Sequence, residues 1–442
     1  MRVDVVLIAT YDLGRQPFGL ASPAAFLRAA GHQVRCADLT RTALPEGEVA
    51  TAALVAFYLP MHTATRLALP VIDRVRALNP AARMCAYGLY APLNADLLRA
   101  RGVQTILGPE FEGDLVNLAD AVRLQPEDPL PRVAFITPDR SDLPPLSKYA
   151  SLQIGGERRI AGYTEATRGC KHRCRHCPIV PVYDGRFRAV PVGVVIADIR
   201  AQVAAGAQHI TFGDPDFFNG PTHALAIVDA LARHCPGVTY DVTIKVEHLR
   251  QQAAALPRLR ETGCLFVTSA VESFDDVVLE KLDKGHTHAD FVEVVRHCEA
   301  IGLTLSPTFV AFTPWTTLDG YGLMLREIER LGLVASVSPI QYAIRLLLPQ
   351  GSRMLELADI RALAGPFDPT SLTHRWRHPD PRVDALQQAL ERLVGSRLNA
   401  PREEVFASVW DIAHEAAGGV PPRRAPLLSR SAIPYLNEPW YC

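Results

Sequence analysis

Short apolar runs alternate with amphipathic segments along most of the chain, and this alternation restricts the folds that the chain can adopt. In residues 1–125, strand-like runs at 3–9, 34–38, 53–59, 83–87 and 105–107 are separated by segments with helical periodicity. A strand, a helix and a second strand in succession favour a parallel sheet. Residues 1–125 are therefore predicted to form an α/β domain with a doubly wound sheet of the flavodoxin type. Its first helix is expected at 22–30, with Ser22 as the N-cap and Pro23 at the first helical position.

A second series of strand and helix patterns follows a proline-rich stretch. Six prolines between 126 and 145 predict an extended linker over residues 126–158. Six strand-like runs then occur at 161–166, 209–212, 239–246, 265–271, 303–312 and 336–344. They predict a partial (β/α)6 barrel of the TIM type at residues 159–349, with an active site at the carboxyl ends of its strands. Residues 350–442 are expected to form a helical extension.

Composition restricts the class of protein. The 442 residues are 48% hydrophobic and 21% charged, with a formal net charge of −1, which is ordinary for a globular enzyme and favours neither a nucleic acid nor a membrane as partner. The first apolar run is too short for a signal peptide. The nine cysteines include six that are scattered singly, which is not a disulfide framework and favours a reducing cytoplasm.

Three of the cysteines stand together directly after the first predicted barrel strand. Cys170, Cys174 and Cys177 form a C-x3-C-x2-C motif, hereafter the cysteine loop. Four cysteines complete the ligand set of a cluster in an electron carrier, so three would leave one iron open to a substrate. A zinc-stabilised binding protein is the non-enzyme alternative, with His172 or His176 as the fourth ligand.

The cysteine loop resembles that of the radical S-adenosylmethionine (SAM) enzymes. The resemblance implies a [4Fe–4S] cluster on Cys170, Cys174 and Cys177, with SAM bound at the open iron. It also implies reductive cleavage of SAM to a 5′-deoxyadenosyl radical, which abstracts a hydrogen atom from a small-molecule or peptide substrate. The electron would come from a reduced protein of the flavodoxin or ferredoxin type. His176 stands where this superfamily often has an aromatic residue.

Two further strand ends continue the resemblance. Gly213, Asp214 and Asp216 end the second barrel strand, where such enzymes contact the ammonium group of SAM, although capping aspartates in an ordinary turn would have the same pattern. Glu272 ends the fourth strand in a turn that resembles G-x-E-S, and its expected partners are the ribose hydroxyls of SAM. The third strand alternates Thr243, Lys245 and Glu247 with apolar residues, so that one set lines the barrel.

The N-terminal domain resembles the B12-binding domain that precedes many radical SAM domains. The turn at 108–112 supports this, but the D-x-H-x-x-G motif that supplies a cobalt ligand is missing, and His62 is a lone histidine at the expected edge of the sheet. Cobalamin is thus a doubtful cofactor. A cobalamin-dependent radical SAM methyltransferase remains the alternative enzyme, and a sheet that helps to bind the substrate is the other role of this domain.

The last residues resemble the approach to the tail of a radical SAM subgroup that ends in Cys-Cys-Ala-Glu-Pro, or in the same sequence with selenocysteine second. Residues 435–442 end in Pro439-Trp440-Tyr441-Cys442. This resemblance implies that the present sequence stops at a selenocysteine codon. It makes Cys442 a candidate catalytic thiol, because selenols and activated thiols ionise readily.

Overall fold

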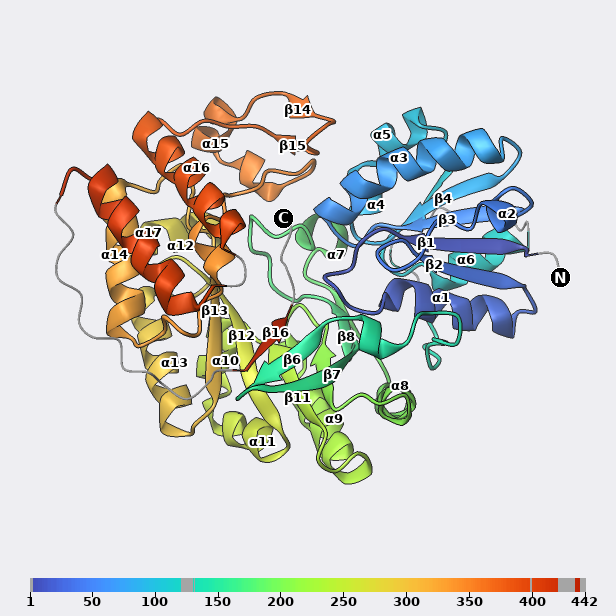
Figure 1. The fold of residues 1–442 in the computed structure, drawn as a ribbon, viewed down its shortest axis with the longest axis horizontal. Coiled ribbons are helices and arrows are strands. Elements are labelled where there is room, and N and C mark those ends of the chain that lie inside the picture. The colour runs from blue at the N-terminus through green and yellow to red at the C-terminus, as the bar shows by residue number, and fades with distance from the viewer. Residues whose placement is uncertain (1–2, 121–129, 131, 398–399, 420–433, 438–442) are drawn as a thin grey trace.

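The computed structural model describes residues 3–120, 130, 132–397, 400–419 and 434–437. Within them, two sheets form the frame of the molecule (Figure 1). The five-stranded sheet has the order β2-β1-β3-β4-β5, and the seven-stranded sheet has the order β13-β12-β11-β10-β7-β6-β16. No helix among the described residues is both long and apolar enough to cross a membrane.

The five-stranded sheet is parallel throughout and is covered on both faces. Its strands are β1 (Val5–Ala9), β2 (Val34–Asp38), β3 (Leu54–Tyr58), β4 (Arg83–Tyr87) and β5 (Thr105–Ile106). Along β1 the side chains alternate: Val5 and Leu7 pack with the helices α1 (Phe18–Ala29) and α6 (Glu112–Ala119), whereas Val6 and Ile8 pack with α3 (His62–Leu78). The predicted doubly wound domain is confirmed. Three short helices, α2 (Glu46–Val49), α4 (Tyr90–Leu93) and α5 (Ala95–Ala100), complete it.

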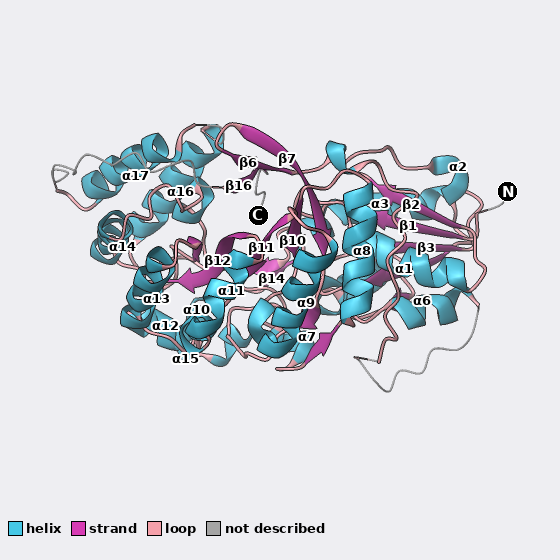
Figure 2. Ribbon diagram, turned by 90° about the horizontal axis from the view of Figure 1, so that it is seen from below, coloured by secondary structure: helices cyan, strands magenta, loops and turns pink. Residues whose placement is uncertain are grey.

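The larger sheet curls into a half-barrel with helices along its outer face (Figure 2). Five neighbouring strands run parallel: β7 (Glu157–Thr164), β10 (His209–Phe212), β11 (Thr239–Thr243), β12 (Cys264–Glu272) and β13 (Thr304–Phe309). The helices are α8 (Val192–Ala204), α9 (Pro221–His234), α10 (Val246–Gln251), α11 (Leu256–Glu261), α12 (Asp276–Leu282), α13 (His288–Ala300) and α14 (Leu318–Arg330). The predicted fold class, a partial TIM-type barrel, is confirmed.

Two strands extend the half-barrel beyond β7. The strand β6 (Ser151–Ile154), which falls inside the predicted linker, pairs antiparallel with β7. The strand β16 (Tyr435–Asn437) pairs antiparallel with β6 and so runs in the same direction as β7. Residues from near the end of the sequence therefore form the edge of the barrel sheet. Cys442 lies outside the described residues.

Three local predictions need correction. The run at 336–344 contains a 3-10 turn at Pro339–Tyr342 in place of a strand, and a single bridge between Phe312 and Arg345 follows it. Helix α1 begins at Phe18 rather than at Ser22, whose hydroxyl group donates a hydrogen bond to Glu112 inside the protein. The strand β11 ends at Thr243, so Lys245 and Glu247 belong to the start of α10 instead of an alternating strand.

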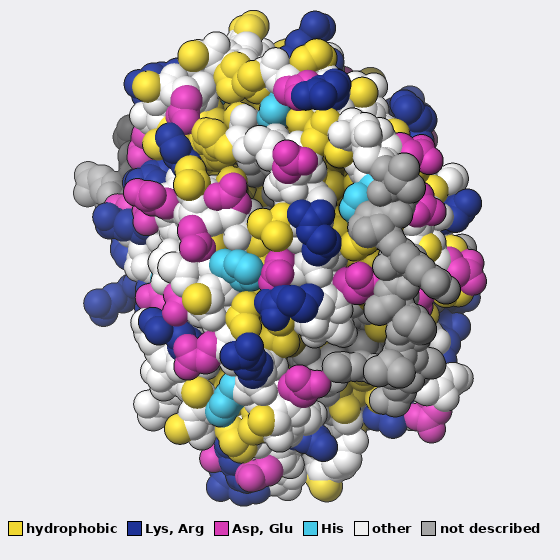
Figure 3. Space-filling model, turned by 90° about the vertical axis from the view of Figure 1, so that its left-hand side faces the viewer, with side chains coloured by type: hydrophobic (Ala, Val, Ile, Leu, Met, Phe, Trp, Pro, Cys, Tyr) yellow, Lys and Arg dark blue, Asp and Glu magenta, His cyan; other side chains and the backbone are white. Residues whose placement is uncertain are grey.

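The C-terminal extension packs on the flank of the half-barrel. It contains α15 (Ala358–Leu363), the short strands β14 (Phe367–Asp368) and β15 (Thr373–His374), α16 (Pro381–Ser396) and α17 (Arg402–Ala416). Figure 1 shows α16 and α17 beside α14, and their apolar side chains join the barrel core through Leu390 and Phe406. On the face drawn in Figure 3, side chains of both charge signs are interspersed.

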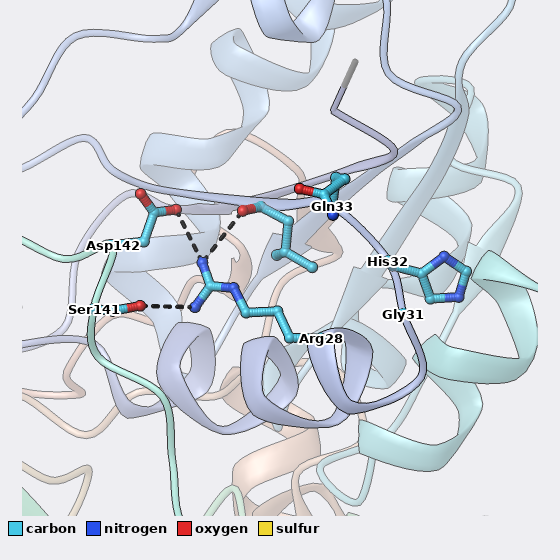
Figure 4. Close-up of a pocket in the computed structure, with 7 residues that line it drawn as sticks. Arg28, Gly31, His32, Gln33, Ser141 and Asp142 are labelled. Carbon is cyan, nitrogen blue, oxygen red and sulfur yellow. Dashed lines mark hydrogen bonds and ion pairs between the residues drawn. The ribbon is translucent and has the colours of Figure 1, made fainter. Parts of the chain in front are cut away.

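The predicted linker is held against the N-terminal domain by charged groups. The guanidinium group of Arg28, at the end of α1, donates to the Ser141 hydroxyl group and to the Val34 carbonyl group and lies 3.4 Å from the Asp142 carboxylate (Figure 4). The same carboxylate accepts hydrogen bonds from Arg35 and from the Cys36 amide. Several of these residues also line a shallow pocket, which contains none of the predicted site residues.

A buried ion cluster joins the two sheets. Arg168, in β8 (Thr167–Gly169), is 7% exposed, and its guanidinium group donates to both carboxylate oxygens of Glu112 at 2.6 and 3.0 Å. It also donates to Glu165 at 2.8 Å and lies 3.7 Å from Glu110. Glu110 lies in the turn before α6, and Glu112 is the first residue of that helix. Burial raises the pKa of Glu110 to about 7, against the nearby positive charge of Arg168.

Replacing this arginine is expected to destabilise the protein strongly. In Arg168→Met, Glu112 keeps a buried charge without its partner, and breaking a buried pair in this way typically costs about 3–5 kcal/mol. Urea unfolding followed by circular dichroism measures the change. The matched control is Arg99→Met, whose exposed pair with Asp96 at 3.6 Å should change the free energy of unfolding by less than about 0.5 kcal/mol. Equal, small effects of both variants would contradict the prediction.

Candidate functional site

The cysteine loop lies at the carboxyl edge of the half-barrel, where β7 ends. After Thr164 the chain forms β8, which pairs antiparallel with β9 (Phe187–Ala189). This two-stranded ribbon closes a loop that carries Cys170, Cys174 and Cys177 and the short helix α7 (Val180–Tyr183). The three cysteines therefore lie after the first barrel strand, as the sequence predicts.

The start of the loop requires glycine. Gly169 has φ +75°, and a Cβ atom there would lie 2.5 Å from the Arg186 carbonyl oxygen and 2.4 Å from the Tyr183 ring. Asn219, in the turn between β10 and α9, contacts the backbone on both sides of Cys170. Its side chain donates to the Gly169 carbonyl group at 3.1 Å and accepts from the Lys171 amide at 3.1 Å.

The thiols are largely buried and spread apart. Burial raises the pKa of Cys170 to about 12 and that of Cys177 to about 11. Thiolates at these positions therefore need a strong positive partner, such as a metal. The three sulfur atoms, all of them described, do not all lie within 4.8 Å of one another. A single zinc ion would hold its sulfur ligands about 3.8 Å apart, given Zn–S bonds of about 2.3 Å.

Beside the loop lies a group that we call the Glu272 pocket: His176, Glu272 and Lys284. Both His176 Nε2, at 3.1 Å, and Lys284 Nζ, at 3.2 Å, contact Oε1 of Glu272. Burial alone would raise the pKa of Glu272, but Lys284 and His176 outweigh it and hold this pKa at about 2. This low pKa keeps the carboxylate ionised at neutral pH. Both contacts among the described residues use Oε1, which leaves Oε2 for a ligand.

The two aspartates of the second strand end have different surroundings. Both carboxylate oxygens of Asp214 accept hydrogen bonds, from the Ala166 amide at 2.9 Å and the Thr167 hydroxyl group at 2.6 Å. Asp214 thus fixes the segment that leads into the cysteine loop. Gly213 has no room for a side chain, since a Cβ atom would lie 1.7 Å from the Tyr163 hydroxyl oxygen.

Asp216 belongs to a second polar group, which we call the two-histidine group: His172, Asp216 and His248. Asp216 Oδ2 lies 2.7 Å from His248 Nδ1 and 3.4 Å from His172 Nε2. Lys245 Nζ lies 3.2 Å from His172 Nδ1 and donates to Glu247 at 3.0 Å. Burial would raise the pKa of Asp216, but the histidines hold it below its usual range.

His286 lies near Lys284 of the Glu272 pocket and near Lys245 beside the two-histidine group. It is 6% exposed, and neither ring nitrogen makes a well-aligned hydrogen bond among the described residues. Burial, together with the charges of Lys284 and Lys245, lowers its pKa to about 4. His286 is therefore a neutral imidazole at pH 7, available to a ligand.

His62, the lone histidine of the N-terminal domain, is already engaged. Its Nε2 lies 2.6 Å from the Ser371 carbonyl oxygen in the C-terminal extension, which makes this nitrogen a donor. Near the same edge of the sheet, the rings of Tyr58, Tyr87 and Phe111 pack together with centroid distances of 4.6–6.1 Å. Burial raises the pKa of Asp12 to about 7. Because His62 Nε2 already donates to Ser371, this nitrogen is not offered to a cobalt ion.

Most of the predicted site residues thus meet at one edge, but several participants were not predicted from the sequence. The cysteines, His176, Gly213, Asp216 and Glu272 come together at the mouth of the half-barrel. Lys284 and His248 were missed as site residues. Lys284 follows α12, away from any strand end, whereas His248 lies just after the end of β11, the kind of position that predicted the other residues.

Comparison with known proteins agrees with this geometry. Residues 164–316 match the family described as "Radical SAM superfamily". A tRNA-2-methylthio-N(6)-dimethylallyladenosine synthase of Chlorobium luteolum is 30% identical over 183 residues, covering 38% of this chain and 40% of the relative. An uncharacterized methyltransferase of Pyrococcus horikoshii is 24% identical over 284 residues, covering 64% of this chain and 56% of the relative. The chain therefore spans about two fifths to somewhat over half of these relatives.

Two solved structures share the fold over nearly the whole chain. The cobalamin-dependent SAM radical enzyme OxsB, with aqua-cobalamin and SAM bound, has a TM-score of 0.71 at 14% identity, covering 92% of this chain and 70% of that one. The radical SAM methyltransferase TsrM of Kitasatospora setae, with cobalamin and a [4Fe–4S] cluster bound, has a TM-score of 0.64 at 15% identity, covering 94% and 89%. Residues 164–316 therefore resemble a radical SAM domain, and the chain shares its overall fold with these two enzymes.

Adding one methyl group at Gly169 is expected to disrupt the cysteine loop. In Gly169→Ala, the positive φ and the contact with the Arg186 carbonyl oxygen force the backbone to move next to Cys170. Iron per chain after anaerobic reconstitution should fall by half or more. Gly193→Ala is the control, because a Cβ atom there meets nothing within 4 Å. Full iron content in Gly169→Ala would contradict the prediction.

Proposed function

We propose that this protein is a radical SAM enzyme that cleaves SAM reductively and uses the 5′-deoxyadenosyl radical to abstract a hydrogen atom from its substrate. One observation carries the proposal. The C-x3-C-x2-C loop stands at the carboxyl edge of the half-barrel, within the segment that matches the radical SAM family.

The residues fit a [4Fe–4S] cluster better than a zinc ion. Cys170, Cys174 and Cys177 would bind three different irons, and their sulfur atoms do not all lie within 4.8 Å of one another, as the ligands of one ion would. Burial would lower the pKa of Lys284, but Glu272 above all, with Cys174 and Cys177, raises it. The charge of Lys284 would offset the negative charge of cysteine thiolates. When bound, the cluster supplies one electron to the sulfonium group of SAM.

The chain's own residues would orient SAM around the cluster. We assign the ribose hydroxyls to Glu272, whose carboxylate is ionised and has Oε2 available. The ammonium group is assigned to the Gly213 carbonyl group, because the Gly213 amide already donates to Thr164 at 2.8 Å. Asp214 holds the segment before the loop in place, and Asp216 faces the histidines instead. His176 would keep Glu272 in position.

The electron donor and the substrate belong to the proposal as well. Lys171 and Arg173 are exposed on the cysteine loop, and this positive charge suits an acidic flavodoxin or ferredoxin-type donor. A small molecule or a peptide is the proposed substrate. Substrate specificity would depend on side chains at the mouth, such as His286, because related folds support different reactions.

A cobalamin-dependent methyltransferase is the second candidate, and the fold shared with OxsB and TsrM favours it. The engaged His62 argues against a histidine ligand to cobalt, but cobalamin can also be bound without a protein ligand to the metal. Purification with added hydroxocobalamin decides between the two candidates. About one retained cobalamin per chain supports the methyltransferase, and none supports hydrogen abstraction without it.

Reductive cleavage of SAM tests the main proposal. Anaerobically reconstituted protein should contain about four irons per chain and form 5′-deoxyadenosine from SAM and dithionite, measured by liquid chromatography. Cys174→Ala should abolish product formation, because one iron loses its ligand. Cys235→Ala, outside the loop, is the control and should retain activity. Colourless protein with one zinc per chain would refute the proposal.

Glu272 can be tested by removing only its charge. In Glu272→Gln the side chain keeps its shape, but ribose hydroxyls lose a charged acceptor. The Kd for SAM, measured by isothermal titration calorimetry on the reconstituted protein, should rise about tenfold, equivalent to about 1.4 kcal/mol. Glu261→Gln, an exposed change on α11, is the control and should leave the Kd unchanged. An unaltered Kd in Glu272→Gln would remove Glu272 from the SAM site.

A further inference from the structure

The two-histidine group has the composition and spacing of a mononuclear metal site. Among the described residues, His172, Asp216 and His248 are the set whose metal-binding atoms all lie within 4.8 Å of one another. They come from three different elements: the cysteine loop, the turn after β10 and the start of α10. We propose that these three side chains bind one divalent transition-metal ion, separate from the cluster.

The distances suit a shared ion. Asp216 Oδ2 lies 3.4 Å from His172 Nε2 and 2.7 Å from His248 Nδ1, and the second pair would move apart to bind an ion. Nitrogen and oxygen ligands bind zinc at about 2.0–2.2 Å, which places two ligands of one tetrahedral ion about 3.4 Å apart. Two histidines and one carboxylate are also the ligands of the non-haem iron(II) triad, which keeps coordination positions open.

Two buried atoms in this group lack the hydrogen bonds that a purely structural cluster would make. Asp216 and His248 are each 1% exposed, yet Asp216 Oδ2 and His248 Nδ1 have no well-aligned hydrogen-bond partner among the described residues. These two atoms are 2.7 Å apart without the alignment of a hydrogen bond. Buried polar atoms are normally satisfied, so the close approach of two unsatisfied ligand atoms indicates that something else binds them. A metal ion satisfies both.

The surroundings supply the outer support that metal-binding histidines need. Glu247 Oε2 lies 3.5 Å from His172 Nδ1, so it can accept the Nδ1 proton when Nε2 binds a metal. Lys245 places a positive charge next to the group, and Glu247 compensates it at 3.0 Å. The carboxylate of Asp216 remains ionised and supplies the negative charge that a divalent cation requires.

Metal content tests this inference apart from the proposed function. The reconstituted wild-type protein is treated with chelating resin, given Zn²⁺ and desalted, and its metals are measured by mass spectrometry. The expected result is about one zinc per chain in addition to the cluster irons. Asp216→Asn and His248→Ala should lose that zinc and keep the cluster irons, while the exposed His234→Gln should keep both. SAM cleavage can fail without changing this result.

Zinc X-ray absorption on the wild-type protein distinguishes this site from zinc on the cysteines. Nitrogen and oxygen ligands near 2.0–2.2 Å, with histidine scattering, support the two-histidine group. Sulfur ligands near 2.3 Å would overturn the inference, because the ion would then lie on the cysteine loop. Wild-type protein that retains no zinc beyond background would overturn it too, as would undiminished zinc in both Asp216→Asn and His248→Ala.

Discussion

Arg168 carries a positive charge into the interior where the two sheets meet, and its neighbours must neutralise it. Glu112 and Glu165 do so through hydrogen bonds of 2.6–3.0 Å, and the rings of Phe18, Phe111 and Phe135 surround the guanidinium group at 5.1–5.7 Å. A buried charge is tolerated only with such partners. Because Arg168 precedes Cys170 by two residues, the same contacts that join the domains also fix where the cysteine loop begins.

The mouth of the half-barrel separates its charges into two balanced groups. In the Glu272 pocket, one carboxylate faces Lys284 and His176. In the two-histidine group, Asp216 faces two imidazoles, and beside the group Glu247 faces Lys245. His286 is buried near both lysines, and its burial together with their charges lowers its pKa and keeps it neutral. This division matches the two proposed binding functions, SAM at Glu272 and a metal ion at Asp216, which lie at different strand ends.

Sequence patterns predicted what depends on local order and missed what depends on tertiary contact. The apolar run Val5–Ala9 and the spacing of the three cysteines are local signals, so the strand and the loop position followed from them. Ser22 has the residue type of an N-cap, but its partner, Glu112, is 90 residues away. The pairing of β16 with β6 and the meeting of His172 with His248 likewise depend on chain folding that no short pattern contains.

Glu272 shows how a strained conformation is maintained at such a site. Its φ is +71°, which is unfavourable for a residue with a side chain, and the register between β12 and β13 shifts at this position. The bulge turns the carboxylate toward the mouth, where Lys284 and His176 bind it. These two charge-assisted contacts offset a backbone strain of about 1–3 kcal/mol. A regular strand would alternate side chains between its two faces, so the bulge is the feature that brings this carboxylate to the cysteine loop.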